Sequence, residues 1–152
     1  MKKALITALL LCGIIILTTA GCGKKTDSDN FDAGKKIDVI INNGPQMSSN
    51  PFDYVKASQK EYDELLKHPK ETFEYSIKEL IKTDAGLGLK SYIEALLCQE
   101  INRNFEYDFE TANDYLENYK KFLENGEADF NSYDEYSKTL IDGSADIENS
   151  VL

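Results

Sequence analysis

The chain has 152 residues, which is enough for one domain together with a leader or a tail. Its 27 acidic residues outnumber its 17 basic residues, so the formal net charge at pH 7 is −10. This balance argues against nucleic-acid binding, because a protein that binds nucleic acid presents a basic face to the phosphates.

Residues 1–21 are predicted to be a signal peptide. Lys2 and Lys3 precede the apolar run Ala4–Leu17, and small residues follow it, which is the pattern of a secretory signal. The run is short for a membrane span, which needs roughly 20 apolar residues. An uncleaved N-terminal anchor helix remains the alternative.

The four residues TAGC, Thr19–Cys22, resemble the bacterial lipobox. The resemblance implies that the chain is cut between Gly21 and Cys22 and that the sulfur of Cys22 receives a diacylglyceryl lipid, with fatty acids such as palmitate. Thr19 departs from the leucine that is commonest at its position. The expected product is a secreted lipoprotein at the outer face of the cytoplasmic membrane, with no other cofactor.

Cleavage before Cys22 would leave 27 acidic and 15 basic side chains, a net charge of −12. Anionic headgroups repel such a body, so we expect the lipid to be the membrane anchor. Cys12 would leave with the signal, so Cys98 would have no partner for an internal disulfide. Stability must then come from an apolar core.

Beyond the signal, residues 22–36 are polar and charged, and we predict a flexible lipid-bearing tether. Residues 37–145 are predicted to form an all-α helical domain, and residues 146–152 a frayed C-terminus. The domain's first segment is ambiguous, because Ile37, Val39 and Ile41 alternate as in a short strand. Since no partner strand is visible, we predict an extended arm packed on a helical body.

Five short helices are predicted beyond this arm. Asn50 as N-cap and Pro51 at the first position open one that runs to His68. Pro69 begins a second, which should end near Gly86. The apolar residues of these two helices recur at helical spacing: Tyr54, Val55, Tyr62, Leu65 and Leu66, then Phe73, Ile77, Leu80 and Ile81.

The third predicted helix has the clearest amphipathic pattern and should be central in the bundle. Its apolar stripe is Leu89, Tyr92, Ile93, Leu96, Leu97 and Ile101. The fourth begins near Thr111, three residues before Asp114, and ends at Gly126. The fifth begins at Ser132, three residues before Glu135, and ends at Gly143. Their apolar faces are Ala112, Tyr115, Leu116, Tyr119 and Leu123, then Tyr133, Tyr136, Leu140 and Ile141.

Few residues could carry catalysis. The single histidine, His68, could form a nucleophilic site with Cys98 and a carboxylate. However, Cys98 follows Leu97 on the most apolar helix, where a free cysteine is usually a small buried hydrophobe. We therefore expect no catalytic residue and a non-enzymatic protein.

Metal sites are also not favoured. Zinc needs clustered histidines and cysteines, and the chain has one histidine. The acidic run DSDNFD, Asp27–Asp32, has alternating oxygen ligands but lacks the glycine at position 6 and the glutamate at position 12 of an EF-hand, where Asp38 stands. We expect no metal and a solvated tether there.

Nine tyrosines and seven phenylalanines are a generous supply for a chain without tryptophan. Between Asn104 and Tyr119 they interleave with acidic residues, which would also suit a paired-carboxylate glycosidase. We favour the interpretation that these aromatic residues belong to the core and that the acidic residues between them face the solvent. Because tyrosine is common at interfaces, we predict that Tyr75, Tyr107 and Tyr136 present a surface to a basic protein or peptide.

The body also carries a resemblance, on MSSNPFDYVKASQKEYDELL (Met47–Leu66) and GLGLKSYIEALLCQEI (Gly86–Ile101). It resembles a small domain of uncharacterised lipoproteins from low-G+C Gram-positive bacteria. It is also similar to an extracytoplasmic segment that trails some beta-lactam-sensor-type membrane metallopeptidases. The peptidase motif is absent, so the resemblance implies a binding or sensing accessory outside the cell and assigns no functional residue.

Three functions follow from these patterns. The favoured one is a lipid-anchored extracytoplasmic binding protein without enzymatic activity. An immunity-type lipoprotein that neutralises a toxin is the second, and a cell-envelope hydrolase that depends on His68 is the third.

Overall fold

The computed structural model describes residues 31–82, 88–126 and 129–149, with side chains as far as Gly143. The signal peptide, the predicted lipid site Cys22 and the predicted helix end at Gly86 lie outside these residues. From Asp32 on, the described residues belong to one compact unit.

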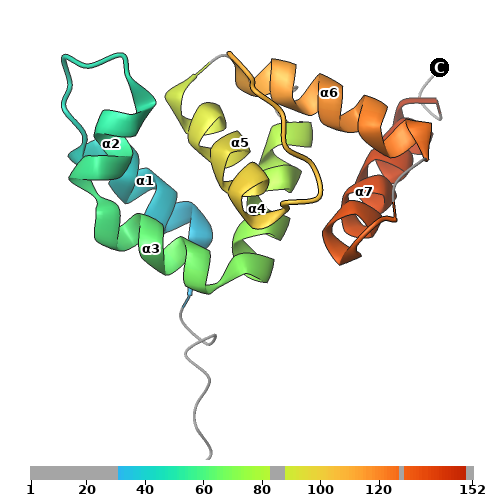
Figure 1. Cartoon of the computed structure of the whole chain (residues 1–152), viewed down its shortest axis with the longest axis horizontal. Coiled ribbons are helices and arrows are strands. Elements are labelled where there is room, and N and C mark those ends of the chain that lie inside the picture. Colours follow the sequence, from blue (N-terminus) through green and yellow to red (C-terminus); the bar gives the residue numbers. More distant parts are fainter. Residues whose placement is uncertain (1–30, 83–87, 127–128, 150–152) are drawn as a thin grey trace, which may run out of the picture. The chain divides into compact units, whose positions relative to one another are not determined.

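The described residues form seven helices and no strand, which confirms the all-α class. The helices are α1 (Ala33–Asn43), α2 (Pro51–Ala57), α3 (Gln59–Lys67), α4 (Pro69–Lys82), α5 (Leu89–Ile101), α6 (Ala112–Asn125) and α7 (Ser132–Asn149). In Figure 1, α4 and α5 lie side by side at the centre of this unit. Helices α1, α2 and α3 pack on one side of that pair, and α6 and α7 on the other.

The predicted extended arm is wrong, because this segment is helix α1. Asp32 caps it, and its Oδ1 accepts a hydrogen bond from the N–H of Lys35 at 3.0 Å. Ile37 and Ile40 are fully buried, whereas Val39 is exposed. The buried residues are therefore three positions apart, as on one face of a helix. The alternation of Ile37, Val39 and Ile41 does not reflect a strand. The helix begins at Ala33, inside the predicted tether.

The first predicted helix is two helices, α2 and α3, which meet at Ser58. The backbone of Ser58 leaves the helical region (φ −127°, ψ 41°), and its N–H donates to the carbonyl of Tyr54 at 3.2 Å. The predicted start is confirmed, because Asn50 Oδ1 accepts from the N–H of Phe52 and Pro51 is the first helical residue. Pro69 begins α4 as expected.

Helix α6 matches its prediction at both ends. Thr111 Oγ1 accepts from the N–H of Asp114 at 3.1 Å, and Gly126 ends the helix with a φ of 61°. The left-handed region suits glycine, which has no Cβ to clash with the backbone. The buried face of α6 is the predicted one: Ala112, Tyr115, Leu116, Tyr119 and Leu123.

Helix α7 begins at Ser132 as predicted, but its cap and its C-terminal end differ from the prediction. Its cap is Asn131, whose Oδ1 accepts from the N–H groups of Tyr133 and Asp134, while Asp134 Oδ2 accepts from the N–H of Asn131 at 3.2 Å. The reciprocal pair therefore lies one residue before the predicted Ser132–Glu135 pair. The helix also continues past Gly143 to Asn149.

Candidate functional site

The three tyrosines predicted to form a partner surface have different neighbours. All three are partly buried. Tyr75 lies against Gly34, where an added Cβ would stand 2.7 Å from the phenol oxygen, and Tyr136 is on α7. Tyr107 lies between α5 and α6 and lines a surface pocket. That pocket is the candidate site, and it contains one of the three predicted residues.

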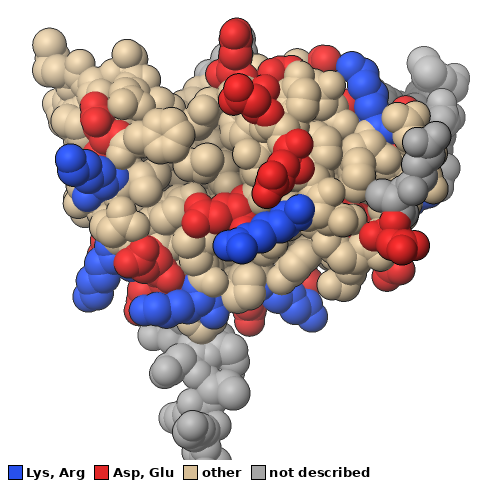
Figure 2. All heavy atoms as spheres, in the orientation of Figure 1, with Lys and Arg blue, Asp and Glu red and all other residues tan. Residues whose placement is uncertain are grey.

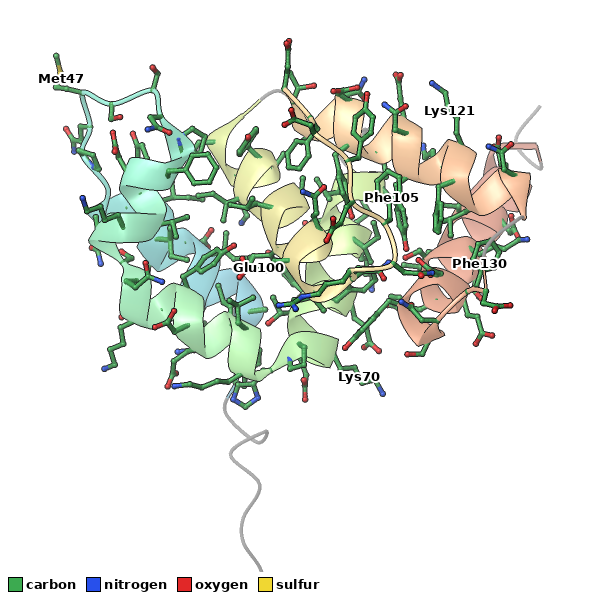
Figure 3. The ribbon with its side chains drawn as sticks, viewed as in Figure 1. Met47, Lys70, Glu100, Phe105, Lys121 and Phe130 are labelled. Atoms are coloured by element: carbon green, nitrogen blue, oxygen red, sulfur yellow. The ribbon has the colours of Figure 1, made fainter. Side chains whose placement is uncertain are left out.

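The pocket lies where α5 ends and the segment towards α6 begins, and its volume is about 530 Å³. In Figure 3 this segment runs upwards beside α5 and carries Phe105, while Glu100 lies at the lower part of α5. The lining residues are Leu96, Gln99, Glu100, Arg103, Glu106, Tyr107 and Asp108.

Internal hydrogen bonds hold the wall of this pocket in place. Gln99 Oε1 accepts from the N–H of Tyr107 at 3.1 Å, which ties the segment back to α5. The ring of Tyr107 stacks on that of Phe105, with the centroids 6.0 Å apart. Burial and the carboxylate of Asp114 raise the pKa of Tyr107, whose hydroxyl donates to Asp114 Oδ1 at 3.5 Å.

A buried polar network anchors the start of the same segment. Asn102 Nδ2 donates to Asp134 Oδ1 at 2.7 Å, and the hydroxyl of Tyr119 donates to the same oxygen at 2.8 Å. Asn104 Nδ2 donates to Asp134 Oδ2 at 2.7 Å. The network joins the C-cap of α5 to α6 and α7, so the stretch on either side of Arg103 is anchored to three helices.

The pocket holds the chain's single arginine among acidic side chains. Arg103 is exposed, and Glu100, Glu106 and Asp108 line the same pocket. Among the described residues, every ion pair lies between residues 32 and 90: Lys35–Asp32, Lys36–Glu64, Lys70–Glu74, Lys82–Glu79 and Lys90–Asp38. Neither Arg103 nor the three pocket carboxylates has such a partner there.

This asymmetry agrees with the distribution of charge along the sequence. Residues 33–82 hold eight acidic and eight basic side chains, whereas residues 83–152 hold sixteen acidic and five basic ones. The excess negative charge therefore belongs to the half that builds the pocket. Figure 2 shows acidic groups from the top of this face to its middle, with basic groups more frequent towards its lower edge.

A second hollow of about 450 Å³ lies where α2, α5 and α6 begin. It is lined by Ser49, Asn50, Pro51, Phe52, Gly88, Leu89, Tyr92, Glu110, Thr111 and Ala112. Its walls are mostly uncharged, in contrast to the first pocket.

The other candidates from sequence do not gather into a site. Cys98 is fully buried, and burial raises the pKa of its thiol. His68 is the C-cap residue of α3. Within the described residues no group of three or more histidine, cysteine or acidic side chains could hold a metal, and no helix there is long and apolar enough to cross a membrane. Asp32 caps α1 and Asp38 pairs with Lys90, while Asp27 lies outside the described residues.

No protein-family model, no curated protein and no solved structure matches this chain.

Proposed function

We propose that the chain is a non-enzymatic, lipid-anchored binding protein at the outer face of the cytoplasmic membrane. The lipobox at Thr19–Cys22 supports the location. The observation that carries the binding role is the pocket at the end of α5, where three carboxylates and one arginine lack ion-pair partners among the described residues.

A basic peptide segment of a partner protein suits this pocket. Lysine or arginine side chains of the peptide would pair with Glu100, Glu106 and Asp108. Arg103 can donate several hydrogen bonds in a planar fork, which fits the main-chain carbonyls of the same peptide. Leu96 and Tyr107 supply an apolar wall for the aliphatic part of a basic side chain.

A peptide titration tests this proposal. The mature chain, kept soluble by Cys22→Ser, is titrated with a short peptide of alternating lysine and glycine and with its glutamate counterpart. We expect the lysine peptide alone to bind, and to bind more weakly as salt screens the charges. The double variant Glu106→Lys/Asp108→Lys should lose at least about tenfold in affinity, equal to about 1.4 kcal/mol.

The matched control is Glu124→Lys/Glu135→Lys, which makes the same change of net charge at exposed positions outside the pocket. If both double variants weakened binding equally, the peptide would respond to net charge alone and the pocket would not be the site. Absence of binding by the lysine peptide would also contradict the proposal.

A further inference from the structure

The large apolar side chains that are exposed gather in one stretch. Among the described residues they are Val39, Met47 and Phe52, with exposed fractions of 39%, 99% and 54%. Residues 39–52, from the end of α1 to the start of α2, contain no charged side chain, although 29% of the chain is charged. An uncharged stretch with an apolar tip therefore lies between Asp38 and Asp53.

The loop between α1 and α2 is braced from within. The hydroxyl of Tyr54 donates to the carbonyl of Ser48 at 3.0 Å, and the N–H of Ser48 donates to the carbonyl of Pro45 at 2.9 Å. Asn50 N–H donates to Ser48 Oγ at 3.1 Å. Gly44 packs on the ring of Tyr54, where any Cβ would collide. These bonds satisfy polar groups inside the loop, and Figure 3 shows Met47 pointing outwards at its tip.

We propose that this loop, residues 44–52, inserts Met47 and Phe52 into the surface of the bilayer that holds the lipid on Cys22. The inference rests on the proposed lipid anchor and adds a second, protein-borne contact with the same membrane. Phenylalanine and methionine side chains enter the boundary of the acyl chains. The carboxylate of Asp53, which accepts from the hydroxyl of Ser48, would then lie at the level of the headgroups.

The length of the chain allows both contacts at once. Asp32 lies ten positions after Cys22, and a stretch of this length can reach at most about 35 Å. Helix α1, with 11 residues, carries the chain about 16 Å from its start to the loop. The stretch from Cys22 to Asp32 can therefore reach farther than the length of α1. The loop can then lie at the same membrane that holds the lipid on Cys22.

Charge favours a bilayer contact through this loop. Anionic headgroups repel the acidic half of the domain, whereas residues 39–52 are neutral. In Figure 3, Met47 lies at the outer end of its loop, well apart from Glu100 near the middle of the face. A domain that rests on Met47 and Phe52 therefore leaves the acidic pocket open to a partner.

The absence of tryptophan from the chain provides a specific test. Full-length lipidated protein with Met47→Trp is reconstituted into phosphatidylcholine vesicles, with or without bromine on the acyl chains. Met47 is almost fully exposed, so the substitution disturbs no packing. We expect a blue-shifted emission that brominated lipid quenches several times more strongly than that of the control Lys121→Trp, whose site is exposed on α6.

Each other outcome counts against the inference. Equal quenching at positions 47 and 121, with both proteins sedimenting with the vesicles, would overturn it and leave the anchor intact. Proteins that do not sediment would refute the anchor and the inference together. A blue shift at position 47 without lipid, which grows with protein concentration, would show that the loop joins two copies of the chain instead.

Discussion

Glu94 is an ionisable side chain in the interior of the domain, and it should make stability depend on pH. Its side chain is 2% exposed, and Oε1 has no hydrogen-bond partner among the described residues. Burial raises the pKa of Glu94 to about 7; Lys90 opposes the rise, and Glu79 and Asp38 add to it. The folded state therefore favours the protonated carboxyl, and this contribution to stability is complete below about pH 4.5 and lost as the pH rises through about 7.

The variant Glu94→Gln tests this dependence, because glutamine keeps the shape of the side chain and does not ionise. Above about pH 7 we expect the variant to be more stable than the unaltered chain by up to roughly 3 kcal/mol in the free energy of unfolding, and so to unfold at a higher temperature. This difference in stability should disappear below about pH 4.5. Thermal melts across this range measure the effect, with the exposed Glu117→Gln as control. Parallel pH profiles for Glu94→Gln and the unaltered chain would contradict the assignment.

Individual residues also show where the sequence pattern stops being informative. The apolar stripe predicted Leu96 on the core face of α5, yet Leu96 is partly exposed and lines the pocket, while Glu94 and Cys98 are buried. Helices α1, α2, α4 and α6 all pack on α5. A helix covered on several sides buries more than one stripe, and helical periodicity does not identify which polar residue is enclosed.

At the scale of elements, the network around Asp134 joins the C-cap of α5 to α6 and α7. The carboxylate of Asp134 accepts from Asn102, Asn104 and Tyr119, and also from the N–H of Asn131 at the start of α7. Removing it leaves one N–H of the buried Asn102 amide without an acceptor, which costs more than the bond itself.

We therefore expect Asp134→Ala to lower the free energy of unfolding in urea by at least about 2 kcal/mol. The adjacent Glu135→Ala, at an exposed position in the same turn of α7, should change it by no more than about 0.5 kcal/mol. Equal effects of the two substitutions would show that the network does not stabilise the junction of α5, α6 and α7.

Elements with strong local signals were predictable from sequence. Thr111 and Gly126 identified both ends of α6, because a cap hydroxyl and a left-handed glycine act within one turn of the chain. Helix α1 was not predictable from sequence, because its alternating apolar residues suit a strand as well as a buried helix face. The pocket was not predictable either. It depends on the hydrogen bond from Tyr107 to Gln99, eight residues apart, and on the network that reaches α7.

At the scale of the molecule, the proposals assign different tasks to different parts of the chain. The lipid on Cys22 would hold the protein at the membrane. The neutral loop at residues 44–52 would rest on the bilayer, and the acidic pocket at the end of α5 would face a basic partner. This division agrees with the charge distribution, which is balanced over residues 33–82 and acidic beyond them. Both the binding role outside the cell and the membrane contact depend on the anchor.

The mass of the protein recovered from the membranes of the cells that make it tests the anchor most directly. We expect a chain that begins at Cys22 and carries a diacylglyceryl lipid on that residue. For Cys22→Ser we expect mature lipid-free chain outside the washed membrane fraction, or a chain that stays in this fraction with its signal uncleaved. A wild-type chain recovered with an unmodified Cys22 would refute the lipid anchor.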